Sequence, residues 1–280
     1  MDYTLAEQIG RDTVISGVRH LHLAQTLDNG QAFRFSGADN RFSGIAHGRR
    51  LELALDGDTL TLYDVELPQF ESIWRDFFDF NRDYSELHKT LAQAPNSDAL
   101  QKALQFSPGL RLLRQDIWEV LVSFILSQNS NIPRIKKMVE QLCQSFGAAL
   151  PCGGYAFPEP KVLAQLSPED LAPVRAGYRN RYIIDAATRV ASGEIDLAKL
   201  SETAGSDEIK DALLKIRGVG PKVADCVLLY GFGRVEHYPS DVWIKRVMAA
   251  HFPDGFPAEI EGVSGIAQQF LFHYVRNKGV

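Results

Sequence analysis

The 280-residue sequence is poor in cysteine, carries no excess of positive charge and contains no long apolar run. Its three cysteines, Cys143, Cys152 and Cys226, are odd in number and lack CxxC spacing, which predicts a reducing compartment and excludes a four-cysteine iron–sulfur cluster. The N-terminal residues carry early charges and no apolar core, so we expect no secretory signal. No uncharged apolar run has membrane-spanning length, and we expect a cytoplasmic protein that needs no membrane, metal or cofactor.

The distribution of charge is more informative than its sum. A net charge of −5 argues against a simple binder of polyanions. Residues 51–100, however, hold eleven acidic and three basic side chains, a net charge of −8, so the rest of the chain carries +3. Basic residues then recur in the middle of the chain: Arg111, Arg114, Arg134, Lys136, Lys137, Arg175, Arg179 and Arg181. We therefore expect a basic face on an acidic body, with modest non-specific affinity for nucleic acid.

Hydrophobic periodicity predicts an α+β protein. Alternation at period two and turn residues predict an antiparallel meander with one buried face, with strands at 18–23, 31–35, 41–47, 51–55 and 59–63. From Pro68 onward the patterns are helical, with an apolar helix at 117–126 and an amphipathic one at 132–146. We expect a β-sheet subdomain with its following helices over 1–105, and a mainly helical domain over 106–280 whose final helix covers 265–277.

A helix, a glycine-rich turn and a second helix form the segment most suggestive of chemistry. Apolar residues at helical spacing predict a helix over 207–216, with Ser206 as its cap. Gly218 and Gly220 then permit positive φ and uncover backbone N–H groups, which suits the close approach of a phosphate oxygen. Pro221 fits the first position of the second helix, where its missing N–H is no loss.

Lys222 and Asp241 are the reactive candidates of this segment. Lys222 falls in the first turn of the second helix, at the positive end of the macrodipole, where a cation is disfavoured and a neutral, nucleophilic amine is favoured. Asp241 follows nineteen residues later and is a natural helix cap. Taken singly, each has an ordinary explanation: a solvated lysine and a simple cap. Together, beside a phosphate-binding turn, they indicate chemistry on a nucleic-acid sugar.

The glycine-rich segment resembles the helix-hairpin-helix motif of the DNA glycosylase superfamily. Its letters are similar to those of the 8-oxoguanine DNA glycosylase branch: GVGPKVADC. The resemblance implies that Lys222 is the nucleophile and Asp241 its electrostatic partner, while Gly218 and Gly220 hold DNA phosphates. Trp243 stands where animal members carry a histidine that contacts phosphate, so it is a DNA-binding candidate that departs from the family pattern.

Two further segments resemble the family elements that fill the gap left by a flipped base. Asn129 matches the gap-filling asparagine and Arg134 a reader of the orphaned cytosine, within RLLRQDIWEVLVSFILSQNSNIPRI. Tyr178 matches the wedge ring beside the orphan base and Arg179 a second cytosine reader, within GYRNRY. The alternative for the polar break around Asn129 is a simple helix connector, and for the arginines a solvated face.

The resemblance also assigns a pocket for the damaged base. The backbone carbonyl of Gly30, the first residue of GQAFRF, matches the group that reads the lesion. Gln268 matches the contact to the Watson–Crick edge and Phe272 the stacking ring, within AQQFLFHYVR. Cys226 matches the opposite wall of the base sandwich. The ordinary alternatives are a turn glycine, a core ring and a buried thiol.

The resemblance extends from about Leu27 to Arg276, with the motifs in the family's order. It implies a bifunctional DNA-repair glycosylase and abasic-site lyase that excises 8-oxoguanine, preferentially opposite cytosine, through a Schiff base. The alternatives are a glycosylase for another damaged purine, many of which lack the lysine, and a non-catalytic protein that clamps DNA with its hairpin. We expect a monomer whose partner is double-stranded DNA containing 8-oxoguanine, a nucleoid-associated location and a prokaryotic source.

Overall fold

The computed structural model describes residues 1–279, and the chain divides into two compact units. The sheet unit comprises Met1–Gly44, Leu51–Arg114 and Val235–Val280, and the hairpin unit comprises Ile45–Arg50 and Gln115–Arg234. Each unit thus combines segments that are distant in sequence. The domain boundary expected after residue 105 remains a prediction.

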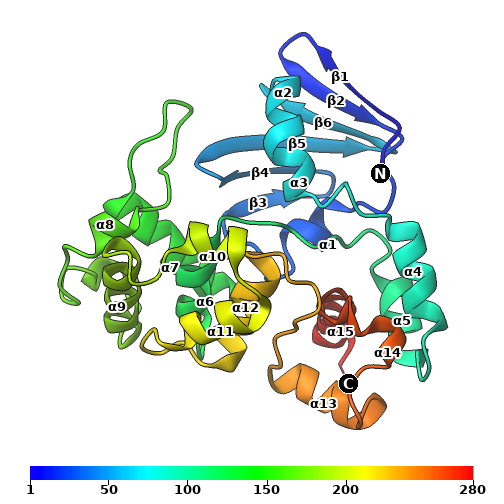
Figure 1. The fold of residues 1–280 in the computed structure, drawn as a ribbon. Coiled ribbons are helices and arrows are strands. Elements are labelled where there is room, and N and C mark those ends of the chain that lie inside the picture. The colour runs from blue at the N-terminus through cyan, green and yellow to red at the C-terminus, as the bar shows by residue number, and fades with distance from the viewer. Residues whose placement is uncertain (280) are drawn as a thin grey trace. The chain divides into compact units, whose positions relative to one another are not determined.

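A six-stranded sheet occupies the N-terminal part of the sequence (Figure 1). Its order is β1-β2-β6-β5-β4-β3, with β1 Leu5–Ile9, β2 Asp12–Ser16, β3 Phe35–Ala38, β4 Arg41–Ala46, β5 Arg49–Asp56 and β6 Thr59–Tyr63. The antiparallel register sets Leu53 opposite Leu62 and Ile15 opposite Leu60. All four side chains are fully buried, because alternate residues of each strand point to the same face. The predicted α+β class with an N-terminal antiparallel sheet is confirmed.

Two of the five predicted strands are wrong, and two observed strands were not predicted. Residues 18–23 lead instead into helix α1, Leu23–Leu27, because the His22 ring accepts the Gln25 N–H and caps a helix. Residues 31–34 are irregular and β3 begins only at Phe35, because the Gln31 N–H donates to the Asn29 side chain and not to a neighbouring strand. The unpredicted strands are β1 and β2; β1 is an edge strand with no buried residue, so its sequence shows no apolar alternation.

The helices of the sheet unit include a stripe of buried aromatic side chains. Three consecutive segments, the middle one a π-helical turn, are α2 Leu67–Gln69, η1 Phe70–Trp74 and α3 Arg75–Phe77. Besides α1, the other helices are α4 Tyr84–Gln93, α5 Asp98–Phe106, α13 Val242–His251, α14 Ala258–Glu261 and α15 Ser264–Lys278. Phe70, Trp74, Phe77 and Phe78 are buried. The C-terminal α15 packs against α5 and α13, which fixes the element expected to line the base pocket.

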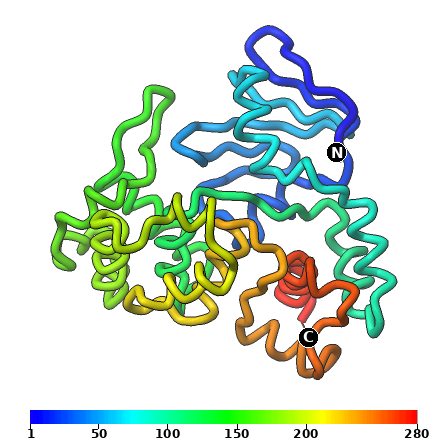
Figure 2. The backbone as a smooth tube through the Cα atoms, in the orientation of Figure 1, coloured from blue at the N-terminus to red at the C-terminus, as the bar shows by residue number. Residues whose placement is uncertain are grey.

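The second segment of the hairpin unit is helical. Its elements are α6 Ile117–Ser127, α7 Ile132–Phe146, α8 Pro160–Leu163, η2 Ala172–Val174, α9 Arg179–Ala191, α10 Leu197–Thr203, α11 Ser206–Leu214 and α12 Pro221–Tyr230. The apolar α6 packs against α7, α9 and α12, and a long loop separates α7 from α8 (Figure 2). Gly205 is the N-cap of α11, so the predicted cap at Ser206 is wrong by one position. Within residues 1–279, no helix is long and apolar enough to cross a membrane.

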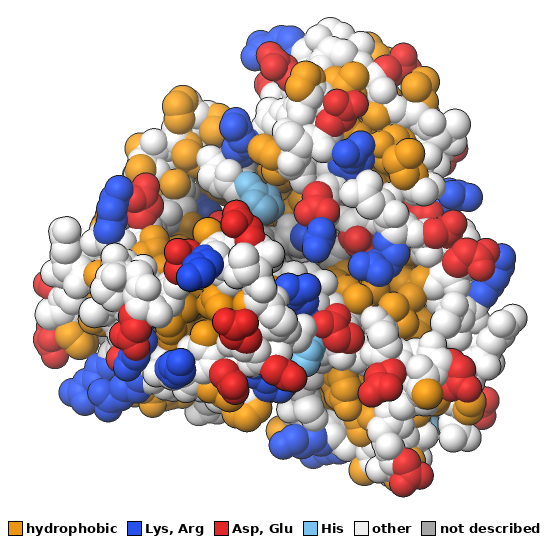
Figure 3. All heavy atoms as spheres, in the orientation of Figure 1, with side chains coloured by type: hydrophobic (Ala, Val, Ile, Leu, Met, Phe, Trp, Pro, Cys, Tyr) orange, Lys and Arg blue, Asp and Glu red, His pale blue; other side chains and the backbone are white. Residues whose placement is uncertain are grey.

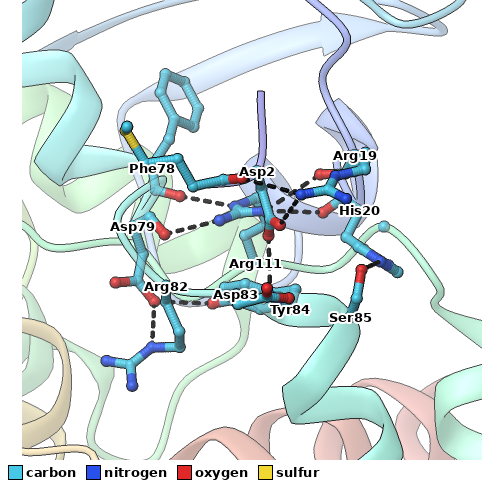
Figure 4. Close-up of polar contacts among 12 residues, drawn as sticks. Asp2, Arg19, His20, Phe78, Asp79, Arg82, Asp83, Tyr84, Ser85 and Arg111 are labelled. Atoms are coloured by element: carbon cyan, nitrogen blue, oxygen red, sulfur yellow. Dashed lines mark hydrogen bonds and ion pairs between the residues drawn. The ribbon is translucent and has the colours of Figure 1, made fainter. Parts of the chain in front are cut away.

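Arg111 does not belong to a basic face, contrary to the expectation from sequence. Its side chain is 0% exposed, and its Nη1 lies 2.9 Å from Oδ2 of Asp2 (Figure 4). Its Nε and Nη2 donate to the carbonyls of Phe78 and Asp79 at 2.8 and 2.7 Å. The ring centroid of Tyr84 lies 4.0 Å from the guanidinium carbon. The charge of Arg111 is therefore neutralised within the core of the sheet unit.

Two other arginines of the predicted basic face are also engaged within their own units. Arg114 pairs with Asp76 at 2.8 Å, and Arg179 is buried and bound to backbone carbonyls. The surface drawn in Figure 3 mixes lysine and arginine with aspartate and glutamate and does not gather one sign. The exposed basic residues that remain from the predicted set all lie in the hairpin unit: Arg134, Lys137, Arg175 and Arg181.

Candidate active site and nucleic-acid interface

A glycine-rich turn joins α11 to α12 in the hairpin unit. Gly218 has a φ of +80°, in the left-handed region that favours glycine, and a β-carbon there would overlap the ring of Tyr182. Gly220 is the extended N-cap of α12, where a β-carbon would meet no atom within 4 Å, and Pro221 begins the helix as predicted. The turn thus leaves open space beside the backbone N–H groups of a helix start, which suits an anion.

Lys222 lies in the first turn of α12 and is half-buried. Its Nζ is 5.3 Å from the ring centroid of Phe124 on α6, and that ring stacks on Tyr230 with a centroid separation of 5.3 Å. The face of an aromatic ring attracts a cation and restricts where the amine can sit. Sequence reasoning missed Phe124, because it lies in a helix that is apolar on all sides and signals only core packing.

The helix that carries Lys222 is tied to the helix before the turn. Cys226, one helical turn after Lys222, is buried. Lys210 on α11 and Asp225 on α12 form an ion pair at 2.7 Å, and both side chains are largely buried. This pair fixes the two helices of the motif against each other and therefore limits the movement of Lys222.

The polar break between α6 and α7 is a tight turn with one left-handed residue. Asn129 has a φ of +47° and is exposed, and asparagine tolerates this conformation better than most residues. The Asn131 side chain caps α7 by accepting the backbone N–H of Arg134 at 3.0 Å. The side chain of Arg134 is exposed. Both residues assigned to the vacated base stack are thus on the surface of the hairpin unit.

Arg179, by contrast, is buried and bound. Its Nε donates to the carbonyl of Gln128 at 2.9 Å, its Nη2 to the carbonyls of Gln128 and Asn129, and its Nη1 to that of Ala176. Its guanidinium carbon lies 4.6 Å from the ring centroid of Tyr178, which is 51% exposed. In this arrangement Arg179 holds the turn that carries Asn129, a contact that the sequence did not reveal.

Gly30 lies in the sheet unit, in a turn that buried amides brace. Its φ is +97°, in the region that favours glycine, as expected of a turn glycine. The Asn29 side chain donates to the carbonyl of Gln25 at 2.6 Å and accepts the Gln31 N–H at 3.1 Å. The Gln31 side chain donates to the carbonyl of Arg111 at 2.8 Å. Sequence reasoning missed Asn29 and Gln31, whose hydrogen bonds hold the backbone on either side of Gly30.

Asp241 caps α13 in the sheet unit, as predicted. Its Oδ1 accepts the backbone N–H of Ile244 at 2.8 Å, and the residue is half-buried. Trp243 in the first turn of α13 is exposed, and the Arg246 guanidinium carbon lies 5.4 Å from its ring centroid. The Asp241 carboxylate and the Trp243 indole, with Arg246 over its ring, thus both lie at the N-terminal end of α13.

Gln268 and Phe272 lie one helical turn apart on α15. Gln268 is 2% exposed, and its Oε1 makes no hydrogen bond within the part of the chain that the structure describes. A buried amide oxygen without a donor is costly and calls for an explanation, such as a ligand. Phe272 is half-buried.

The candidate residues are divided between the two units. The hairpin unit brings Asn129, Tyr178 and Arg179 together and also carries Lys222 and Cys226. In the sheet unit, the helix that Asp241 caps packs against the helix that carries Gln268. No group of three or more His, Cys, Asp or Glu side chains among residues 1–279 is arranged to hold a metal ion.

Two family models match consecutive parts of the chain. Residues 13–121 match the N-terminal domain of 8-oxoguanine DNA glycosylase, and residues 122–256 match the HhH-GPD superfamily of base excision DNA repair proteins. A probable N-glycosylase/DNA lyase from Methanothermobacter thermautotrophicus is 32% identical over 214 residues, which cover 65% of this chain and 68% of the relative. The chain belongs to the 8-oxoguanine DNA glycosylase family. The family predicted from its motifs is therefore confirmed.

Solved structures resemble this 8-oxoguanine glycosylase family member along its whole length. The structure of MBOgg1 in complex with a low-affinity DNA ligand has a TM-score of 0.91 and 42% identity and covers 100% of both chains. The Clostridium acetobutylicum 8-oxoguanine glycosylase/lyase, in complex with double-stranded DNA containing cytosine opposite 8-oxoguanine, has a TM-score of 0.91 and 32% identity, again over 100% of both chains. The family likeness thus includes both units.

Proposed function

We propose that this protein excises 8-oxoguanine from double-stranded DNA, preferentially opposite cytosine, and then cleaves the strand at the abasic site through a Schiff base. The observation that carries the proposal is the position of Lys222. Its amine lies in the first turn after the glycine-rich turn and is held against the Phe124 ring. A Schiff base requires an amine at this point, and a protein that only clamped DNA would not need one.

The hairpin unit supplies the groups that would extrude the base. A base inside a duplex is out of reach of a nucleophile, so the nucleotide must leave the stack. The amides around Gly218 and Gly220 hold the phosphates of one strand, and Trp243 of the sheet unit adds a further contact to DNA. The exposed Asn129 and Tyr178 enter the vacated stack, where Arg134 and Arg179 read the orphaned cytosine.

The sheet unit supplies the groups that would recognise the lesion. 8-Oxoguanine carries an N–H at its seven-position, where guanine has a lone pair. The Gly30 carbonyl accepts from that N–H, and the loss of such a buried bond discriminates against guanine by about 1–3 kcal/mol. The Oε1 of Gln268, which has no donor within residues 1–279, accepts from the Watson–Crick edge. Phe272, one helical turn after Gln268, stacks on the base.

The proposed chemistry uses Lys222 and Asp241. The Lys222 amine forms a bond to the anomeric carbon as the glycosidic bond breaks, and the base leaves with the bonding electrons and takes up a proton. The sugar becomes cationic as the base departs, and the Asp241 carboxylate stabilises this charge. Ring opening gives a Schiff base, and loss of a proton from the adjacent carbon expels the 3′ phosphate by β-elimination. No cofactor is required for either step.

The family likeness also bears on partners and location. The two structural neighbours described above are both bound to DNA ligands. We propose that this chain acts on DNA as a monomer, because each group that the mechanism uses is present in one copy of the chain. We also propose a nucleoid-associated location, because the substrate is DNA, and a prokaryotic source, because the relatives named above include proteins of an archaeon and a bacterium.

Borohydride trapping tests this function directly. Wild-type protein would be incubated with duplexes that carry 8-oxoguanine opposite each of the four bases, with an undamaged duplex as the control. We expect a covalent complex with the damaged duplexes and the fastest excision opposite cytosine. Equal rates opposite cytosine and adenine would refute the partner preference, whereas absence of any trapped complex would refute the lyase itself.

A further inference from the structure

Helix α9 contacts the glycine-rich turn through two of its side chains. The ring of Tyr182 lies directly against Gly218, in the space that a β-carbon there would need. The Oδ2 of Asp185 accepts the backbone N–H of Arg217 at 2.8 Å, just before that glycine. Arg189 on the same helix pairs with this carboxylate at 3.0 Å and orients it. The turn is therefore held from the side by α9, in addition to its own two helices.

The N-terminal end of the same helix holds the turn that carries Asn129. Arg179, the first residue of α9, donates to the carbonyls of Gln128 and Asn129. The ring of Tyr178 lies beside the Arg179 guanidinium and meets the Tyr182 ring edge-on, with centroids 5.6 Å apart. An unbroken series of contacts thus runs from the glycine-rich turn through two tyrosine rings and one guanidinium to the Asn129 turn.

We infer that α9 is a strut that fixes the spacing between the phosphate-holding turn and the Asn129 turn, and that Tyr182 is a positioning residue for base extrusion. The inference rests on the proposed function, because it matters only if these two turns act on the same duplex. Short turns with a left-handed residue have few internal restraints, whereas a helix of 13 residues is stiff. We assign Tyr182 no contact with the base or the sugar. It acts through the backbone of Gly218 and through the ring of Tyr178.

This spacing matters because extrusion needs two simultaneous contacts. One turn grips the phosphates while Asn129 enters the stack at a nucleotide set by that grip. Displacement of a positioning group by about 1 Å can lower a rate about a hundredfold, even when that group lies away from the chemistry. Loss of the Tyr182 ring would leave a void between the two turns, so that each could move independently of the other.

Substitution of Tyr182 by alanine tests the strut. We expect Tyr182→Ala to slow single-turnover excision of 8-oxoguanine opposite cytosine by about tenfold or more. Tyr182→Phe keeps the ring and is expected to retain the wild-type rate. Tyr155→Ala, which removes an exposed tyrosine from the α7–α8 loop of the same unit, is the matched control. Asp185→Ala provides a second break in the strut, at its other contact with the turn, should the alanine variant at 182 fail to fold.

A double-mutant cycle with Asn129→Ala separates the strut from a simple loss of stability. If α9 couples the two turns, the substitution at Tyr182 costs less excision rate once Asn129 is gone, so the combined loss is smaller than the product of the single losses. A wild-type rate for both Tyr182→Ala and Asp185→Ala, or losses that multiply in the cycle, would overturn the inference. Wild-type protein that fails to excise 8-oxoguanine would refute the proposed function instead, so the two failures are distinguishable.

Discussion

Arg111 in the sheet unit and Arg179 in the hairpin unit are both almost fully buried, yet their surroundings differ. Arg111 is paired with a buried carboxylate and lies against the Tyr84 ring, and its acceptors come from segments far apart in sequence. Arg179 donates to neutral backbone carbonyls, two of them in the exposed turn that carries Asn129. The Arg111 guanidinium thus stabilises the core of the sheet unit, and the Arg179 guanidinium stabilises an exposed turn of the hairpin unit.

The two arginines differ in how costly it is to exchange their hydrogen-bond partners. A buried guanidinium with a fully desolvated carboxylate partner is costly to separate, so it stays where it is. Burial raises the pKa of the neighbouring Tyr84, and the charge of Asp79 adds to the effect. The Tyr84 hydroxyl therefore stays protonated and donates to the Asp79 carboxylate. Hydrogen bonds to neutral carbonyls can be exchanged for bonds to a base at a smaller cost. The proposed role of Arg179 as a cytosine reader is therefore compatible with its burial, whereas Arg111 is confined to the core.

The largest expected effect is on chemistry in the hairpin unit. Lys222→Gln removes the amine and is expected to reduce excision and borohydride trapping to background, while the melting temperature and the affinity for a lesion duplex stay near wild type. Lys215→Gln, at the exposed end of α11, is the matched control and is expected to remain active. Trapping and single-turnover assays measure both. A Lys222→Gln protein that still traps would show that another amine is the nucleophile.

The next effect is on stability in the sheet unit. Arg111→Met leaves the buried Asp2 carboxylate with the more distant and partly exposed Arg19, at 3.5 Å, as its cationic partner, and is expected to lower the free energy of unfolding by about 3–5 kcal/mol. Arg114→Met removes the partly exposed pair with Asp76 and is expected to cost about 1 kcal/mol or less. Urea unfolding followed by circular dichroism measures both. Equal losses in the two variants would contradict the structural role assigned to Arg111.

A smaller effect is expected at Asp241, where a cap and a proposed catalytic charge coincide. Asp241→Asn keeps an oxygen that can cap α13, so the melting temperature should barely change. Loss of the charge that stabilises the cationic sugar should lower the single-turnover rate by about a hundredfold or more. The rate, the melting temperature and the affinity for an uncleavable lesion duplex are measured together. A rate that falls only in step with stability would reduce Asp241 to a cap.

The smallest expected effect concerns pH and the sheet unit. Burial, followed by the charge of His20, lowers the pKa of His88 to about 4, against an ordinary value of 6.5. Between these two pKa values His88 binds a proton in the unfolded chain but not in the folded protein. The free energy of unfolding therefore decreases as the pH falls from about 6.5 towards 4. Melting temperatures across this range should fall less steeply in His88→Phe, where the ring at 88 keeps its contact with Phe270. An unchanged slope would assign the acid sensitivity to other groups.

Sequence patterns predicted local structure well where one segment contains all the necessary information. The helix boundaries around residues 117–146, Pro221 as the start of α12 and Asp241 as a cap all depend on neighbouring residues, and the structure has them as predicted. The family assignment depended on several such segments in a characteristic order. The proposed roles of the site residues came from the same likeness and remain predictions.

Sequence by itself therefore determined the α+β class, the glycine-rich turn and the candidate nucleophile, because each is specified by the spacing of nearby residue types. Tertiary structure alone decided which arginines are surface charges, what contacts Lys222 and what supports the turn at Asn129. The partners of Arg111, at Asp2, Phe78 and Asp79, are separated from it by tens of residues, and no periodic pattern reports such contacts. In the sequence, Phe124 and Tyr182 likewise look like ordinary packing residues. Only the folded chain brings the Phe124 ring beside Lys222 and the Tyr182 ring against Gly218, because these contacts join residues that are distant in sequence.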